Sequence, residues 1–237
     1  MIHPAPDRLL MIRGFFCIIK VLEYKEVILP LIHSKKTFSS HLSTSLGEIQ
    51  LKGPMTEEEL KQYPLHSRLD SFRKANQQHQ ALIEIANLEE GRVNVAISEK
   101  VIIGYVTFLH PDPIERWSTF YMENLLELGA IEIAPSYRGI GLGSKLIELS
   151  VTDPFMENYI IISTEYYWHW DLNNSKLSVW DYRKIMEKMM FAGGLTPAPT
   201  NDPEIMAHPA NCLMVRIGKN VTEKDRKLFD QLRFLNA

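Results

Sequence analysis

The strongest constraint on this chain is a strand–turn–helix pattern in the segment 125–149, LLELGAIEIAPSYRGIGLGSKLIEL. Residues 125–134 are almost all apolar, which is typical of a strand buried on both faces. Pro135 and Ser136 end this strand, and from Ser144 onward the spacing of leucine and isoleucine predicts a helix. We therefore expect an α/β fold in which a central strand leads directly into a helix.

The turn between this strand and this helix predicts a site for a phosphate or pyrophosphate. Its three glycines leave backbone N–H groups uncovered, and the helix N-terminus adds a partial positive charge. The turn residues are Arg138, Gly139, Gly141, Gly143 and Ser144. Their spacing differs from the dinucleotide fingerprint, and the Ser-Lys order after Gly143 is the reverse of that in a P-loop. An ordinary glycine-rich turn without a ligand is the alternative.

Length and composition narrow the class of protein. A chain of 237 residues fits one domain with an appendage. The net charge of −3 and the pI near 6.3 do not indicate a nucleic acid or an anionic membrane as partner. The two cysteines, Cys17 and Cys212, indicate no disulfide framework and fit a reducing cytoplasm. Neither they nor the eight histidines have metal-ligand spacing, so we expect no metal site.

We expect two parts, an N-terminal arm of residues 1–45 and a domain of residues 46–237. Residues 9–22 are apolar, but they are too few to span a bilayer and they include Arg13. They predict an extra strand or a loosely packed arm, with contact to a membrane as the alternative. The polar run 33–45 predicts a linker into the domain.

Periodicity, caps and turn residues predict the order β-α-α-β-β-β-α-β-α-β-β, followed by a terminal helix. The elements are a strand at 48–51, a helix after Thr56, a helix at 71–87, strands at 92–98, 101–109 and 125–134, a helix from 144, a strand at 159–164, a helix at 178–191, strands at 195–200 and 212–217, and a helix at 222–234.

The R-x-x-G-x-G spacing, preceded by a strand that ends in proline, resembles the motif that binds the pyrophosphate of acetyl-CoA in the GNAT superfamily of N-acetyltransferases. The predicted element order is also similar to that fold, a mixed and mostly antiparallel central sheet flanked by helices, with acetyl-CoA at splayed central strands. The resemblance implies that residues 138–144 hold the pyrophosphate. It also implies that the backbone of Ile131 and Ile133 pairs with the pantetheine arm.

Two glutamates of the central strand are candidates for a general base, because a carboxylate in a dry cleft has a raised pKa. We predict that this pair supplies the base and rank Glu132 marginally first, because it lies beside the backbone expected to hold the thioester. Glu127 lies close to the place where histone-type members of the superfamily carry their base. A bulge in the strand would change the face that each side chain occupies. The alternatives are a rim carboxylate for Glu127 and an ion-pair partner for Glu132.

The acid that protonates the leaving thiolate is not identified. Many members of the superfamily carry a tyrosine at the position that matches Met190 here. The candidates to supply this proton in its place are Tyr166, Tyr167, Tyr182, His169 and solvent.

The aromatic run 166–170, YYWHW, predicts a wall for the acceptor or a surface for protein docking. Its candidate residues are Tyr166, Trp168 and His169, and Thr200 is a candidate for the acceptor mouth. A hydrophobic cap over the sheet and an ordinary turn role for Thr200 are the alternatives.

Longer strings between residue 47 and the C-terminus are similar to the acetoin-utilisation acetyltransferases of Bacillus-type bacteria. Examples are MENLLELGAIEIAPSYRG at 122–139 and STEYYWHWDL at 163–172. This resemblance implies a protein N-ε-lysine acetyltransferase that uses acetyl-CoA to inactivate AMP-forming acetyl-CoA synthetase at the synthetase's active-site lysine. From the residues alone, an acetyltransferase for small amines and a regulatory docking protein that binds coenzyme A stay open.

Overall fold

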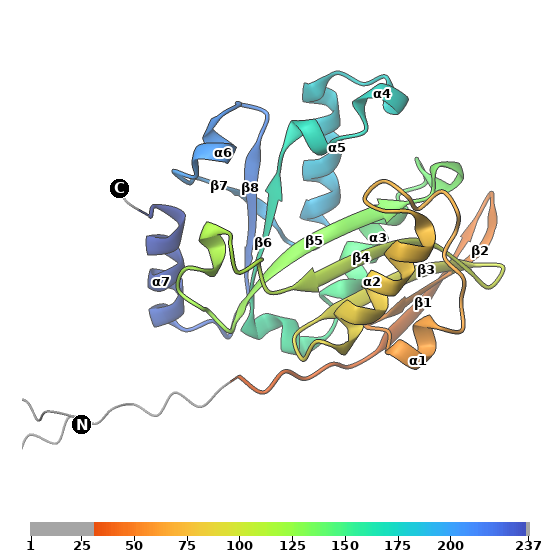
Figure 1. Ribbon diagram of the computed structural model, residues 1–237, viewed down its shortest axis with the longest axis horizontal. Coiled ribbons are helices and arrows are strands. Elements are labelled where there is room, and N and C mark those ends of the chain that lie inside the picture. Colours follow the sequence, from red (N-terminus) through yellow and green to blue (C-terminus); the bar gives the residue numbers. More distant parts are fainter. Residues whose placement is uncertain (1–30, 236–237) are drawn as a thin grey trace, which may run out of the picture. The chain divides into compact units, whose positions relative to one another are not determined.

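The computed structural model describes residues 31–235, and the compact unit that they form begins at Leu31. Its centre is an eight-stranded sheet with the order β1-β2-β3-β4-β5-β6-β8-β7 (Figure 1). Neighbouring strands run antiparallel except β5 and β6, which run parallel. The sheet is therefore mixed and mostly antiparallel, as predicted. The strands are β1 (Phe38–Thr44), β2 (Gly47–Gly53), β3 (Arg92–Ser98), β4 (Val101–Leu109), β5 (Leu125–Ile133), β6 (Ile160–Glu165), β7 (Thr196–Ala198) and β8 (Cys212–Ile217).

Helices cover both faces of this sheet, with α1 and α2 on one face and α3 and α5 on the other (Figure 1). The capping box predicted after Thr56 is present, because the Thr56 hydroxyl accepts the Glu59 N–H and the Glu59 carboxylate accepts the Thr56 N–H. The α-helices are α1 (Glu57–Leu60), α2 (Ala75–Asn87), α3 (Leu142–Ser150), α4 (Leu172–Ser175), α5 (Val179–Phe191), α6 (Pro203–Met206) and α7 (Glu223–Arg233). The 3-10 helices are η1 (Arg116–Ser118), η2 (Pro135–Tyr137), η3 (Pro154–Asn158) and η4 (Tyr167–His169).

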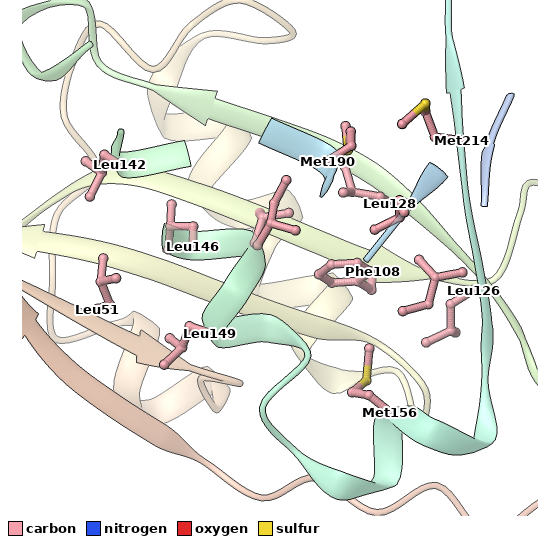
Figure 2. Close-up of a cluster of buried hydrophobic side chains, with 14 of the residues drawn as sticks. Leu51, Phe108, Leu126, Leu128, Leu142, Leu146, Leu149, Met156, Met190 and Met214 are labelled. Carbon is pink, nitrogen blue, oxygen red and sulfur yellow. The ribbon is translucent and has the colours of Figure 1, made fainter. Parts of the chain in front are cut away.

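The core between α3 and the sheet holds the glycine turn in place. Leu142, Leu146 and Leu149 of α3 pack in one cluster with Phe108 of β4 and Leu128 of β5 (Figure 2). Complete burial of a leucine side chain stabilises a fold by about 1.5–3 kcal/mol. This layer therefore fixes α3, and the turn that leads into it, against the central strand.

The prediction of a linker at 33–45 is wrong for residues 38–44, which form the edge strand β1. Every residue from Phe38 to Thr44 pairs with β2, and of these side chains Phe38 and Leu42 pack on the core. The three serines of β1 are exposed at the edge of the sheet, where a polar strand is tolerated. Because these side chains are polar, the sequence predicted a linker here. The part of the predicted arm at 1–30 lies outside the described residues.

Two further boundaries differ from prediction. The helix predicted from Ser144 begins at Leu142, because Gly141 adopts a left-handed conformation with φ 77° and serves as its N-cap. The strand predicted at 195–200 spans only Thr196–Ala198, and Asp202 then caps the short helix α6 by accepting the N–H groups of Glu204 and Ile205. None of the helices formed by residues 31–235 is long and apolar enough to cross a bilayer.

Candidate functional site

The parallel strands β5 and β6 pair over only three residues each and then separate. Their register joins Leu125–Glu127 to Ile160–Ile162, and beyond it β5 pairs with β4 alone among the described strands. The Ala134 N–H donates to Ile103 of β4 at 2.9 Å. Because backbone groups alternate in direction along a strand, those of Ile131 and Ile133 face the opposite, unpaired edge. The two strands thus form a V, and the backbone predicted to hold the pantetheine arm lines it.

A bulge at Gly129 decides where the two strand glutamates point. Thr107 pairs with Ala130 and Phe108 with Leu128, so Gly129 is an extra residue in β5. A Cβ at Gly129 would lie 2.7 Å from Leu109 Cδ2, which explains why glycine fits there. Residues five apart on a regular strand point to opposite faces, and the extra residue reverses this. Both glutamates therefore lie on the face of β5 that α2 covers.

Glu127 lies at the point where the V opens. Its side chain is half-buried, and its Oε1 accepts the hydroxyl of Thr164 on β6 at 3.1 Å. Burial, together with the nearby carboxylate of Glu115, raises the pKa of Glu127 to about 7. No ion pair joins Glu127 to a lysine, arginine or histidine within residues 31–235. A carboxylate with this pKa accepts a proton near neutral pH, as a general base must.

Glu132 is also placed on that face, but both of its carboxylate oxygens are engaged. Oε1 accepts the Ser71 N–H at 3.0 Å and Oε2 accepts the Tyr105 hydroxyl at 2.8 Å. The side chain is buried and ties β5 to the segment between α1 and α2. This geometry favours a structural role for Glu132 and reverses our preference between the two glutamates.

The glycine turn fits an anionic group. Gly139 and Gly141 have φ values of 82° and 77°, and a Cβ at either position would meet no atom within 4 Å, so the space above the turn is open. The first N–H bonded within α3 is that of Lys145, which donates to Gly141 at 3.2 Å. Within residues 31–235, the N–H groups of residues 142–144, including the predicted Ser144, therefore have no hydrogen-bond acceptor at the helix N-terminus.

Gly143 and Arg138 of the predicted motif have other partners in this structure. A Cβ at Gly143 would lie 2.5 Å from Met189 Sδ, so this glycine also lets α3 approach α5. The Arg138 Nε donates to the Ile133 carbonyl at 2.9 Å, and its Nη1 donates to Asp171 Oδ2 at 2.7 Å. The guanidinium thus lies at the end of the V next to the turn.

The structure brings three of the four predicted acceptor residues together. The ring of Tyr166 stacks on that of Trp168 with 4.9 Å between centroids, and the ring of His169 meets it edge-on at 5.7 Å. Tyr166 packs with Ile162 on the face that carries Glu127. Thr200 is not part of this ring cluster but lines the same hollow as His208, and its hydroxyl donates to the Arg233 carbonyl at 2.7 Å and accepts the Asp202 N–H at 3.1 Å.

Prediction from sequence missed two carboxylates near the V. Glu165, at the end of β6, is buried, and it accepts the Ser163 hydroxyl at 2.8 Å and the Trp170 indole N–H at 3.2 Å. Burial raises its pKa. Asp171 is the partner of Arg138. The sequence signal that could have identified Glu165 is a glutamate at the end of a strand that begins with three isoleucines. No local pattern identifies Asp171.

Two further expectations from the sequence, on the position of Met190 and on metal binding, can be compared with the structure. Met190, at the position of the superfamily's tyrosine, is fully buried in the core beside α3 and has no ionisable group. Within residues 31–235, no three side chains of histidine, cysteine, aspartate or glutamate are grouped to hold a metal ion.

Comparison with known proteins identifies the class. The signature of the Acetyltransferase (GNAT) family matches residues 54–169, which include the V, the glycine turn and η4. The chain is 54% identical over 202 residues to the acetoin utilization protein AcuA of Bacillus subtilis (strain 168), covering 85% of this chain and 96% of that protein. The chain belongs to the GNAT family and is an acetyl-CoA-dependent acetyltransferase.

Two other relatives are equally similar to the chain. The acetoin utilization protein AcuA of Bacillus licheniformis is 53% identical over 204 residues, covering 86% of this chain and 97% of that protein. The crystal structure of an acetoin utilization protein from Exiguobacterium sibiricum superimposes with a TM-score of 0.82 at 56% identity, covering 85% of this chain and 95% of that one. The predicted fold class, the recognised family and the co-substrate are thereby confirmed.

Proposed function

We propose that this acetyltransferase modifies a lysine ε-amino group of a protein, and that the protein is AMP-forming acetyl-CoA synthetase in the cytoplasm. The observation that supports amine acetylation most directly is Glu127, a carboxylate with a pKa of about 7 at the mouth of the V. The synthetase is proposed from the resemblance to acetoin-utilisation acetyltransferases, and the similarity to proteins of that name supports it.

The chain's own residues suit direct transfer. Bound acetyl-CoA supplies an acetyl thioester, and the free N–H groups of residues 142–144 and the turn glycines suit its pyrophosphate. The backbone of Ile131 and the N–H of Ile133, which no described strand pairs, suit its pantetheine arm, whereas the Ile133 carbonyl accepts the Arg138 guanidinium. In its carboxylate form, Glu127 takes the proton that the ammonium group of the acceptor must lose before its nitrogen attacks. A new C–N bond then replaces the C–S bond.

An exposed aromatic surface supports a protein acceptor. It consists of Trp168, Tyr167, His208 and Trp180, whose rings follow one another at centroid distances of 5.4, 4.2 and 6.4 Å. The side chains of Trp168 and Trp180 are 48% and 52% exposed, although large apolar groups of this kind favour burial. Next to them is a hollow of about 460 Å³ lined by residues that include Ala198, Ile205, Met206 and Leu213. Aromatic side chains and methionine are enriched where proteins bind one another.

Intact-mass spectrometry of acetyl-CoA synthetase tests the proposal. After incubation with this protein and acetyl-CoA, we expect one added acetyl group on one lysine and loss of synthetase activity. A reaction without the acetyltransferase is the control. An unchanged synthetase mass, on a synthetase preparation that a known acetyltransferase does modify, would reject the synthetase as acceptor.

Matched variants separate docking from chemistry. Exchange of Trp180 for alanine should raise the KM for the synthetase and leave the affinity for coenzyme A unchanged, because this side chain lies on the aromatic surface outside the V. Exchange of the exposed Phe191, on the same helix, for alanine serves as the control for a general loss of apolar surface. Equal effects of the two exchanges would argue against the aromatic surface as the docking site.

A further inference from the structure

An ion pair joins the ends of the two strands that separate. Arg138 follows β5 and Asp171 follows β6, and Arg138 Nη1 lies 2.7 Å from Asp171 Oδ2. The same guanidinium is bonded through Nε to the carbonyl of Ile133, the last residue of β5. Because β5 and β6 pair only near their N-terminal ends, the V opens toward their C-terminal ends. The Arg138–Asp171 pair spans that open end.

The Asp171 side of the pair is anchored to the sheet. Trp170, the preceding residue, donates its indole N–H to the buried carboxylate of Glu165, at the end of β6. Its ring stacks on Tyr182 of α5 with 5.3 Å between centroids. Asp171 itself accepts the side-chain amide of Asn174 at 2.7 Å through its other oxygen. These contacts hold the carboxylate where the guanidinium meets it.

We propose that the Arg138–Asp171 pair is a clasp across the open end of the V, which has to open each time acetyl-CoA enters and each time coenzyme A leaves. Asp171 is then a positioning residue that sets the rates of exchange. The two side chains are 39% and 29% exposed. Ion pairs as exposed as this one change an equilibrium by a factor of about 1.5 to 5, so the clasp opens readily.

The clasp differs in its kinetics from two simpler roles of Asp171. If the carboxylate only repels the phosphates, its removal speeds association and slows dissociation. If it only positions Arg138 to bind the phosphates, its removal speeds dissociation alone. A clasp that closes equally over the empty and the occupied V slows both steps, so breaking it accelerates both by the same factor and leaves the affinity nearly unchanged. The inference rests on acetyl-CoA as co-substrate and is independent of the acceptor.

Stopped-flow tryptophan fluorescence of the full chain, mixed with increasing concentrations of coenzyme A, tests the proposal. The slope of the observed rate against concentration gives the association rate constant, and the intercept gives the dissociation rate constant. For Asp171→Asn we expect both to rise by about 1.5- to 5-fold, with a Kd from isothermal titration within twofold of wild type. Asp171→Glu should restore both rates toward wild type.

Two further variants complete the design. Trp170→Phe keeps an aromatic ring on Tyr182 but removes the N–H that binds Glu165, and it should accelerate both rates in the same way. Asp181→Asn, which removes the exposed ion pair to Lys184 on α5, should change neither rate. A change in only one rate constant of Asp171→Asn, changes in opposite directions, or no change would overturn the clasp. None of these results depends on whether acetyl-CoA synthetase is the acceptor.

Discussion

Glu127 combines two properties at the scale of a single residue, a raised pKa and a position at the opening of the V. Its ordinary pKa of 4.5 would leave it fully ionised at neutral pH and a weak base. Burial and the carboxylate of Glu115 bring the value to about 7. Glu132, five positions further along the same strand, is less suited to accept a proton, because Ser71 and Tyr105 already donate hydrogen bonds to its two carboxylate oxygens.

The pH dependence of acetyl transfer should report on Glu127. Because the base acts as a carboxylate, kcat/KM should rise with pH and level off above about pH 7. Glu127→Gln should lower kcat/KM by a factor of about 10² to 10⁴ and remove this titration, with little change in the affinity for coenzyme A. Steady-state kinetics from pH 5.5 to 9, spanning the pKa of about 7, provides the measurement.

If Glu127→Gln kept the wild-type profile, the base would lie elsewhere. Glu132→Gln is the matched comparison, since it changes the other glutamate on this face. It should lower the free energy of unfolding by about 1–3 kcal/mol, because an amide has a single acceptor oxygen and cannot accept both the Ser71 N–H and the Tyr105 hydroxyl as the two carboxylate oxygens do, while the titration near pH 7 persists.

The same pKa has a consequence for stability. A carboxyl group with a folded-state pKa of about 7 and an ordinary value of 4.5 binds its proton more tightly in the folded protein. It therefore penalises the folded state above pH 7, and the penalty disappears as the pH falls through 7 to 4.5. Glu127→Gln should be more stable than wild type at pH 8 by about 1–3 kcal/mol, with no difference below pH 4.5. Urea denaturation at both pH values measures this, and a constant difference would contradict it.

At the scale of the element, the strand–turn–helix unit β5-η2-α3 joins the strand that carries the proposed base to the turn proposed to bind the pyrophosphate. Leu142 and Leu146 pack α3 on β5, while Gly141 turns the chain through a left-handed conformation so that the first N–H groups of α3 stay free. The bulge at Gly129 adds the one residue that brings Glu127 onto the face of Glu132.

Two substitutions at Gly141 separate the effect of a changed backbone conformation from the effect of an added negative charge. Gly141→Asp should abolish measurable binding of coenzyme A, because it places a negative charge at the helix N-terminus where the pyrophosphate belongs. Gly141→Asn is the control, since asparagine tolerates the left-handed conformation and carries no charge, and it should retain binding at reduced affinity. Isothermal titration measures both. Wild-type affinity in Gly141→Asp would exclude this turn as the pyrophosphate site.

At the scale of the whole molecule, a buried ion pair connects distant parts of the chain. Arg92 of β3 and Asp153, the N-cap of η3, are 3.1 Å apart, with side-chain exposures of 1% and 6%. The Asp153 carboxylate also accepts the N–H groups of Lys36 and Phe155. The pair thus links the start of the described chain, the sheet and the connection between α3 and β6.

Removal of this carboxylate should destabilise the fold strongly. Asp153→Ala leaves the guanidinium of Arg92 buried without its partner, and we expect a loss of about 3–5 kcal/mol in the free energy of unfolding. Urea denaturation measures it. Glu148→Ala removes the exposed ion pair to Lys145 and should change stability by less than about 1 kcal/mol. Similar losses in the two variants would show that the buried Arg92–Asp153 pair contributes no more to the free energy of unfolding than the exposed pair.

Much of the fold follows from local sequence signals. Alternating and continuous apolar runs predicted β3 and β4 with their observed bounds, and capping residues predicted the starts of α1 and α7. The glycines also predicted the sharp turn before α3, because the left-handed conformation of Gly139 and Gly141 is a local requirement, and the anion site there stays a prediction. β1 was missed, because a polar edge strand is stabilised by pairing with β2 and not by its own side chains.

What the sequence determined by itself was therefore the class of elements and the family, and it predicted a cofactor turn, because each of these depends on residues that are neighbours in the chain. Only the tertiary structure decided which environment each of several chemically identical groups occupies. Glu127 and Glu132 are indistinguishable as letters in one apolar strand. The bulge at Gly129, set by pairing with β4, and the partners Ser71 and Tyr105 give them different environments. Arg138 likewise meets Asp171 through long-range folding, because no local spacing encodes contacts between residues that far apart in the chain.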